Sequence, residues 1–321
     1  MQTKITTKRV LFISFFVDIL DVVTNIVVAV ITGSAVIFAE MVQGVTDTLG
    51  SYLLIIGYRR SNKPKDPSHP FGYTREVFFW SLLSSMVMLF LGSGLSLWRG
   101  YSQTRAPEII HGKWLALGIL FFSVITNSYS LMQSVKKLHI PGTNLIHVFK
   151  VSGKQLVKTT LIKDLLGTLS ALIGLAAIAM YDLTGILFFD GLGAIFIGIL
   201  MVVFALILTY QTRNLIAGMA VPKAIIVKIR ESVTKIPEVI TINHLAAIYT
   251  GTEKVLVDLD LDISKNLNTT QIENVLDHVK KAVTSDIPEV QSVQIDLNSP
   301  LVKEEVIIEK TPENILPGQM K

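Results

Sequence analysis

The chain is 321 residues long, with 50% hydrophobic and 17% charged residues and a formal net charge of +4, and its mean hydropathy is +0.53. This composition is typical of a membrane protein and not of a soluble domain of the same size. The chain contains no cysteine, which excludes disulfide bonds and thiolate metal sites.

Six apolar segments of about 20 residues or more occupy the first two thirds of the chain, and each is long enough to cross a hydrocarbon core of ~30 Å. We place them near residues 10–31, 34–57, 77–101, 114–135, 155–180 and 184–212. Lysine and arginine gather before the first segment, after the second and after the fourth. By the positive-inside rule, both termini of this multi-pass protein lie in the cytoplasm. The sequence therefore predicts a six-helix transmembrane domain over residues 1–212.

The composition changes after Arg213. Helical spacing over 222–236 is followed by alternation over 239–249 and 253–263, then by helical spacing over 268–283 and alternation over 290–297. The order αββαβ predicts a small ferredoxin-like α+β domain over residues 213–298, on the cytoplasmic side. The tail, residues 299–321, is charged and contains proline, which favours a flexible segment.

Polar residues interrupt three of the apolar segments at helical spacing. Glu40, Gln43 and Asp47 stand at i, i+3 and i+7, which places them on one stripe of the second helix. The other two stripes are Asp18 with Asp21 in the first segment and Thr160 with Asp164 in the fifth.

The predicted depth of these carboxylates in the membrane bears on their function. At a rise of ~1.5 Å per residue, Asp21, Asp47 and Asp164 each lie roughly 15 Å into the membrane, near its midplane. An ionised carboxylate there costs at least ~2.5–3.5 kcal/mol, so protons, cations or water must compensate the three. The alternative is that polar groups only join helices by hydrogen bonds. We expect the neighbouring Lys163 to extend towards the interface, with pairing to Asp18 as the other option.

Three stretches carry a resemblance to a known family. "TGSAVIFAEMVQGVTD" (32–47), "KPKDPSHPFGYTRE" (63–76) and "FFDGLGAIFIGILM" (188–201), together with the six-span and αββαβ layout, resemble the cation diffusion facilitators, which export divalent metals in exchange for protons. The linker between the fourth and fifth spans is most similar to a divergent branch that includes a mitochondrial zinc transporter. The likeness covers about residues 10–298.

The resemblance implies functional residues at the matching positions. It implies a transport site at Asp47 and Asp164 with Gln43 and Thr160 as weaker ligands, and helices one, two, four and five that rock against three and six. It also implies a loop site at Asp66 and His69. Further ligand positions fall in the last domain, and they are His244, Asp258, Glu273 and Asp296. A solvated acidic face is the alternative there, because strand alternation alone places the carboxylates of "DLDLD" on one side.

Two positions depart from the family pattern, because Gln43 and Thr160 stand where stronger ligands are common. All six histidines lie outside the predicted spans, so the membrane site is expected to offer only oxygen atoms. Oxygen ligands suit manganese, iron or magnesium, whereas the resemblance points to zinc. We therefore expect the transported metal to be zinc or manganese, followed by iron.

Two functions from different classes fit these residues. The first is a proton-coupled efflux transporter for divalent cations, in which Glu40, Asp18 and Asp21 line a polar pathway. The second is a non-transporting scaffold or metal sensor that retains the fold. In either case we expect a homodimer in contact with membrane lipid, no enzymatic activity, no cofactor and no nucleic-acid partner, with the metal as substrate in the first case.

Overall fold

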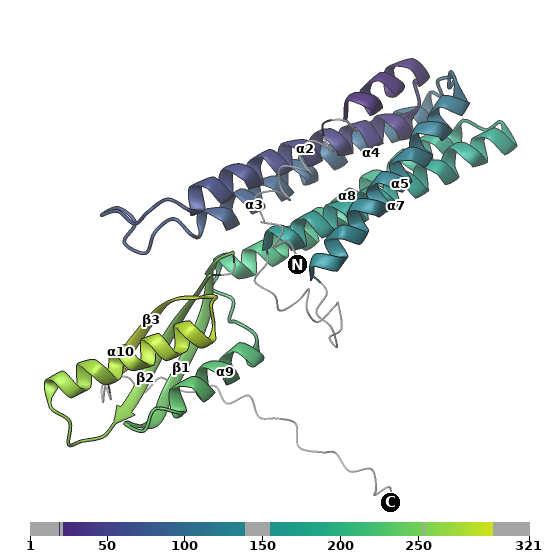
Figure 1. The fold of residues 1–321 in the computed structure, drawn as a ribbon. Coiled ribbons are helices and arrows are strands. Elements are labelled where there is room, and N and C mark those ends of the chain that lie inside the picture. Colours follow the sequence, from purple (N-terminus) through teal and green to yellow (C-terminus); the bar gives the residue numbers. More distant parts are fainter. Residues whose placement is uncertain (1–18, 20–21, 139–154, 253, 298–321) are drawn as a thin grey trace, which may run out of the picture.

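The computed structural model describes residues 19, 22–138, 155–252 and 254–297. It consists of an elongated bundle of helices with a small α+β domain at one end (Figure 1). A short helix, Val22–Thr32, comes first. The labelled elements of the bundle are α2 (Ala35–Ser61), α3 (Glu76–Val87), the π-helical turn η1 (Met88–Gly92), α4 (Ser93–Arg105), α5 (Lys113–Leu138), α7 (Gln155–Thr184) and α8 (Phe188–Ile216).

Within the described residues, four helices are long and apolar enough to cross a membrane. They are Glu76–Arg105, which joins α3, η1 and α4, then Lys113–Lys136, Lys158–Thr184 and Phe188–Ile216. Each coincides with one of the predicted spans from the third to the sixth. Helix α2 matches the second predicted segment, but its polar stripe makes it less apolar, and most of the first segment lies outside the described residues. Six spans therefore stay a prediction.

Glycines bring the helices α4 and α8 into direct backbone contact. A Cβ atom at Gly100 would lie 2.8 Å from the carbonyl oxygen of Gly191, and one at Gly191 would lie 2.9 Å from that of Gly100. Small residues at helix interfaces are the usual means by which membrane helices pack closely. The two helices can therefore be treated as one packed unit.

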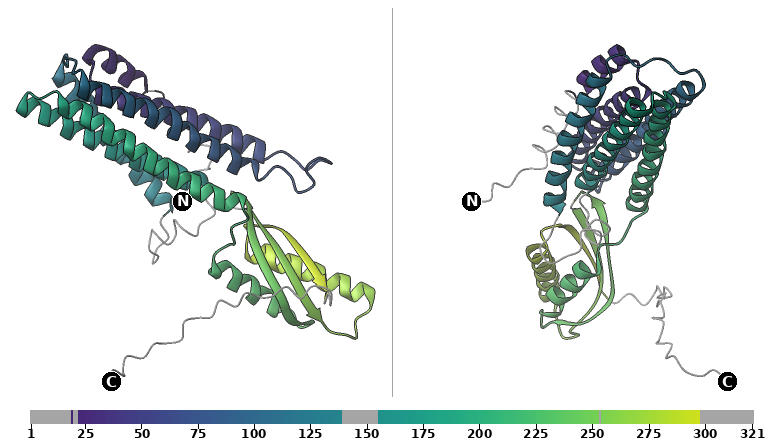
Figure 2. Two further views of the ribbon diagram at one scale, coloured as in Figure 1. Left: turned by 180° about the vertical axis from the view of Figure 1, so that it is seen from behind. Right: turned by 90° about the vertical axis from the view of Figure 1, so that its right-hand side faces the viewer.

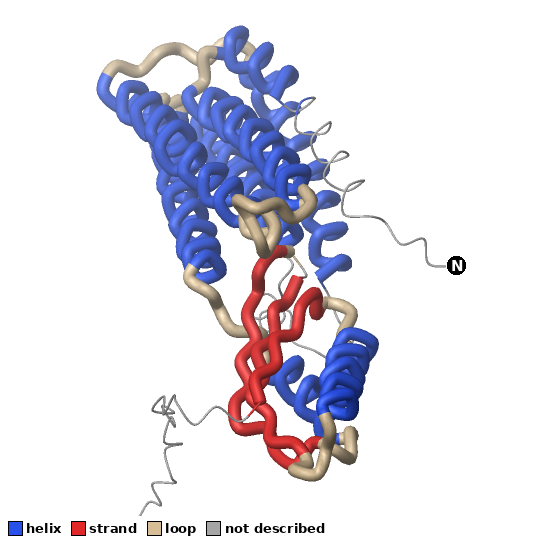
Figure 3. Tube along the Cα trace, turned by 90° about the vertical axis from the view of Figure 1, so that its left-hand side faces the viewer, coloured by secondary structure: helices blue, strands red, loops and turns tan. Residues whose placement is uncertain are grey.

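The α+β domain contains α9 (Lys223–Thr234), β1 (Val239–Gly251), β2 (Lys254–Ile263), α10 (Thr269–Asp286) and β3 (Val290–Leu297). Strand β2 is central, antiparallel to β1 and parallel to β3. Both helices lie on the same side of the strands (Figure 3). The predicted order αββαβ is confirmed.

Alternation along β2 assigns its two faces. Val255, Val257, Leu259 and Leu261 are buried in the core that the helices cover, where Val275 and Val279 of α10 also lie. The residues between them, including the carboxylates of "DLDLD", therefore point to the open face of the sheet.

The two parts of the chain share one hydrophobic cluster. It joins Leu54 of α2, Phe78 of α3 and Leu215 of α8 to Tyr249 and Val255 of the sheet. The strands accordingly lie directly beyond the end of α8 (Figure 2). The α+β domain is thus packed against the end of the bundle at which α2 ends and α3 begins.

Candidate functional site

Asp164 lies on α7, and its carboxylate faces α5. Its two oxygen atoms accept hydrogen bonds from the hydroxyls of Ser130, at 2.8 Å, and Ser134, at 2.5 Å. The residue is 9% exposed. Ser130 and Ser134 stand one helical turn apart in the fourth predicted span, so a polar stripe that the sequence analysis overlooked holds this carboxylate.

Asp47 lies on α2, and its partner is Lys163 of α7. The Lys163 ammonium is 3.6 Å from Asp47 Oδ1 and donates hydrogen bonds to the Asp47 carbonyl oxygen and, at 2.9 Å, to Ser51 Oγ. The Lys163 side chain is only 8% exposed. The expectation that it extends to the interface is therefore wrong, because a buried carboxylate, a carbonyl and a hydroxyl satisfy the ammonium inside the bundle. The alternative partner, Asp18, lies outside the described residues, as does Asp21.

The other two predicted transport-site residues, Gln43 and Thr160, and the predicted pathway residue Glu40 lie on the same helices. Glu40 and Gln43 are buried on α2, and Thr160 is half-buried on α7. Gln43 Oε1 is buried without a hydrogen-bond partner in the described part of the chain. An acceptor of this kind is costly unless a ligand or water satisfies it.

The structure brings the stripes of α2 and α7 together through Lys163. It does not bring Asp47 and Asp164 into a ready-made metal cluster, because Asp47 faces the ammonium and Asp164 faces α5. Among the described residues there is no group of three or more histidine, aspartate or glutamate side chains that could hold a metal ion. A cation would reach both carboxylates only after these contacts rearranged.

The predicted loop site at Asp66 and His69 forms a compact turn. Asp66 Oδ1 accepts hydrogen bonds from Ser68 Oγ at 2.6 Å and from the backbone N–H of His69 at 2.8 Å, and Oδ2 accepts one from the Tyr73 hydroxyl at 2.6 Å. The bond from Ser68, followed by that from Tyr73, holds the pKa of Asp66 well below its usual range. The His69 ring stacks on Tyr73 with centroids 4.0 Å apart. These contacts give both residues a role in packing the loop, and metal binding at them stays a prediction.

A cavity of about 840 Å³ lies next to this loop, between the start of α3 and one end of the sheet, where residues of all three strands line it. Its lining includes His69 and Trp80 together with the basic residues Arg60, Lys65 and Arg75. It is distinct from the Asp47 and Asp164 region, which lies further along the helices.

The four predicted ligand positions of the α+β domain do not converge. In the sheet register, Asp258 lies beside Ala246 and Gln294, whereas His244 and Asp296 flank Asp260 in the next row of the open face. Glu273 belongs to α10, on the opposite face of the sheet. Metal binding at these residues stays a prediction, and the acidic open face is the arrangement that the strands display.

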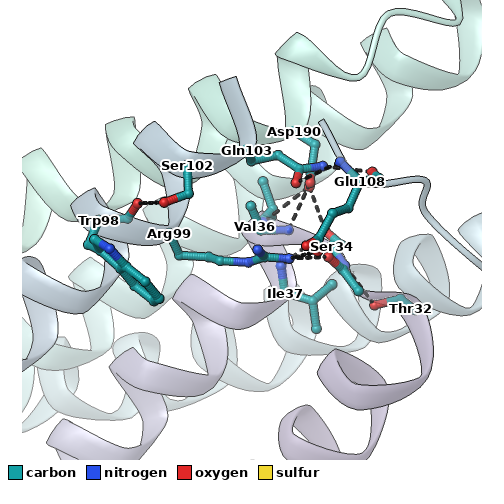
Figure 4. A network of polar contacts seen from close by, with 12 residues as sticks. Thr32, Ser34, Val36, Ile37, Trp98, Arg99, Ser102, Gln103, Glu108 and Asp190 are labelled. Atoms are coloured by element: carbon teal, nitrogen blue, oxygen red, sulfur yellow. Dashed lines mark hydrogen bonds and ion pairs between the residues drawn. The ribbon is translucent and has the colours of Figure 1, made fainter. Parts of the chain in front are cut away.

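A second polar cluster, which the sequence analysis missed, lies where α2 and α8 begin, at the end of the bundle away from the α+β domain. Figure 4 shows its contacts. The carboxylate of Asp190, at the start of α8, is fully buried. It accepts hydrogen bonds from Ser34 Oγ at 2.5 Å and from the backbone N–H groups of Ala35 at 2.7 Å and Val36 at 3.1 Å. A carboxylate at a helix N-terminus accepts hydrogen bonds from backbone N–H groups that have no partner within the helix. Its negative charge also interacts favourably with the helix dipole. Asp190 therefore anchors the start of α2 to α8.

Arg99 of α4 extends this cluster. It donates a 3.0 Å hydrogen bond to the Gly33 carbonyl and pairs with Glu108 at 2.5 Å. The hydrogen bond and the charge of Arg99 hold the pKa of Glu108 below its usual value. The turn between Val22–Thr32 and α2 is thereby tied to α4 as well as to α8.

Comparison with known proteins gives two domain matches. A family model described as the cation efflux transmembrane domain matches residues 11–216. A second one, described as the cytoplasmic domain of cation efflux proteins, matches residues 221–299.

Individual relatives are distant. The chain is 23% identical over 288 residues to the mitochondrial proton-coupled zinc antiporter SLC30A9 of Xenopus laevis, an alignment that covers 87% of this chain and 52% of that protein. It is 24% identical over 271 residues to the manganese efflux system protein MneS of Bacillus subtilis (strain 168), an alignment that covers 82% of this chain and 85% of that protein. A solved structure of a MamM C-terminal-domain variant is 20% identical and has a TM-score of 0.23, covering 25% of this chain and 95% of that one. The chain spans about half the length of the antiporter relatives that it matches.

Proposed function

The chain belongs to the cation efflux family of membrane transporters, the cation diffusion facilitators, and from this premise we propose that it is a proton-coupled exporter of a divalent metal cation, zinc or manganese before iron. Membership places it in a family of transporters and not of enzymes. The metal is its substrate.

The observation that carries the proposal is the presence of two buried carboxylates on adjacent helices in the middle of the bundle. Asp47 is 13% exposed at its side chain and lies opposite α7, and Asp164 of α7 is 9% exposed. Their common role is to supply the charge that a divalent cation needs, with Gln43 and Thr160 as weaker oxygen ligands. Ionised groups at such depth are usually functional, because they are expensive to keep for structure alone.

Proton coupling follows from charge balance. When the cation leaves, two buried negative charges remain, and Lys163 can compensate only one of them. A proton is the simplest compensation for the other, since like charges in a low-dielectric site do not both stay ionised without a partner. A relative at 23% identity carries the name proton-coupled zinc antiporter, and another at 24% carries the name manganese efflux system protein. The first name supports an antiport of metal against protons, and the two names together support zinc and manganese equally as the metal.

The same proposal covers the architecture. We expect six spans over residues 1–212, a ferredoxin-like domain over 213–298 and both termini in the cytoplasm; the predicted tail, 299–321, lies outside the described residues. A homodimer held by the cytoplasmic domain is consistent with a three-stranded sheet whose open face carries neither α9 nor α10, the two helices of the described domain. Glu40, Asp18 and Asp21 would line the polar pathway, and loop and cytoplasmic metal sites at Asp66 and His69 and at His244, Asp258, Glu273 and Asp296 are accessory.

A specific observation favours the second candidate, a scaffold or metal sensor that does not transport. Each carboxylate already has protein partners, Ser130 and Ser134 for Asp164 and Lys163 for Asp47. A protein that had lost transport could keep such contacts as helix-to-helix joints.

Metal flux into vesicles under a proton gradient decides between the two candidates. We expect Asp47→Asn and Asp164→Asn each to abolish metal-dependent proton movement while expression and insertion persist. Asp182→Asn is the matched control, because Asp182 lies at the far end of α7 in an ion pair with Lys113. Transport at the wild-type rate in either site variant would show that the site is misplaced, and no flux of zinc, manganese or iron through the wild type would favour the scaffold.

A further inference from the structure

The Lys163 ammonium lies 3.6 Å from Asp47 Oδ1 and places a positive charge beside this expected metal ligand. We propose that this lysine is a tethered cation, which neutralises Asp47 while the transport site is empty and is displaced from it when a divalent cation binds. The inference rests on the transport function proposed above and adds a residue that determines how tightly the substrate is held.

The surroundings of the ammonium fit this role. Three oxygen atoms surround the ammonium: it donates hydrogen bonds to the Asp47 carbonyl oxygen and, at 2.9 Å, to Ser51 Oγ, and it forms an ion pair with Asp47 Oδ1 at 3.6 Å. All three belong to α2, although the lysine belongs to α7. The ammonium is therefore held by the very residue that is expected to bind the substrate.

Gly50 lies on α2 beside the ammonium and close to Ser84 of α3. A Cβ atom at Gly50 would lie 3.5 Å from Lys163 Nζ and 2.4 Å from Ser84 Oγ of α3. Any side chain there would press on α3 and approach the ammonium. Because residue 50 has no side chain, this part of the α2 surface is open to both α3 and α7.

Formal charge shows why the ammonium must move. Asp47, Asp164 and Lys163 together carry one negative charge, so a divalent cation added beside them would leave an excess of one positive charge in a buried site. Like charges at close range are unfavourable in a low dielectric. Once the ammonium withdraws, the two carboxylates and the cation balance.

The long side chain of Lys163 allows its ammonium to move away from Asp47. Lys163 lies eight residues into α7, and its four-carbon stem can carry the ammonium along the helix towards water while the Cα stays in place. The ammonium keeps its protons throughout and changes only its position. The lysine thus competes with the substrate for Asp47, which weakens metal binding and speeds metal release.

The test is metal binding and transport by the full-length protein, measured with Zn²⁺ and with Mn²⁺. We expect Lys163→Met to lower the dissociation constant and the KM by about tenfold or more, equal to about 1.4 kcal/mol, and to lower the maximal transport rate because release slows. Lys163→Arg should restore values near those of the wild type, since it returns a positive charge. Lys158→Met, which removes another buried lysine from the same helix, should change neither constant.

A purely structural ion pair predicts a different outcome. An unchanged or raised dissociation constant in a monodisperse Lys163→Met protein would overturn the proposal while leaving the transport function intact. If that variant does not fold, labelling of wild-type Lys163 by an amine-reactive reagent, read by mass spectrometry, replaces it. Saturating metal should increase labelling at Lys163, and equal labelling with and without metal would overturn the proposal. A wild type that neither binds nor transports divalent cations would remove both this inference and the proposed function.

Discussion

Replacing Asp190 by asparagine tests whether its carboxylate anchors α2. In the native protein the two oxygen atoms accept three hydrogen bonds from Ser34, Ala35 and Val36. Asparagine has one acceptor oxygen, so when that oxygen takes the place of Oδ1, the amide NH₂ faces the N–H of Ala35. Two donors then oppose each other in a fully buried position.

The magnitude follows from two losses. Leaving one buried backbone donor unsatisfied costs about 1–3 kcal/mol, and losing a negative charge at a helix N-terminus costs about 0.3–1 kcal/mol, or up to ~2 in buried geometry. Relief from burying a charge offsets part of this. We expect a net loss of about 2–4 kcal/mol, which lowers the unfolding midpoint of the membrane domain by roughly 5–10 °C.

The assay is thermal unfolding of the purified protein in detergent. Ser34→Ala is the graded control, because it removes one donor and the side-chain cap of α2 at a cost of about 1 kcal/mol. A midpoint for Asp190→Asn that equals that of the wild type, or lies above that of Ser34→Ala, would refute the anchoring role of the carboxylate.

Two further predictions concern selectivity and assembly. Thr160→His should shift the preference towards zinc, because it places an imidazole one turn before Asp164; competition among Zn²⁺, Mn²⁺ and Fe²⁺ checks this, and an unchanged rank order would show that residue 160 does not face the ion. The full-length protein should be a dimer whose stability metal increases, because association covers the open sheet face and a divalent cation screens its carboxylates. Light scattering in detergent with and without metal measures this, and a monomer in both conditions at tens of micromolar protein would contradict it.

Periodicity was sufficient to predict most of the secondary structure. The alternation of "VLVDLDLDI" predicts both the strand and its open acidic face, because side chains on a strand alternate strictly. Helical spacing likewise predicts that Gln43 and Asp47 share a stripe of α2. These features are local, so the sequence contains them completely.

Partners across helices could not be predicted in the same way. Spacing shows that Lys163 and Asp164 point in different directions, but it does not say which helix lies in each direction. The pairing of Lys163 with Asp47 and of Asp164 with Ser130 could therefore not be predicted. Asp190 was missed for the same reason, since its partners are more than 150 residues away in sequence. The π-helical turn at Met88–Gly92 has no glycine or proline at its start that would indicate it.

The anchor at Asp190 also determines how far each part of α2 moves when the helices rock. Because the first residues of α2 are held to α8 by hydrogen bonds, a tilt of α2 about that end against the packed pair of α4 and α8 would move its distant residues most. Asp47 lies 12 residues beyond Ala35, or about 18 Å along the axis, and the end of the helix lies about 39 Å away. A tilt of about 10° would carry Asp47 through about 3 Å and the end of the helix through about 7 Å. The first displacement is enough to exchange one ligand for another, and the second would reach the α+β domain, which is packed against that end.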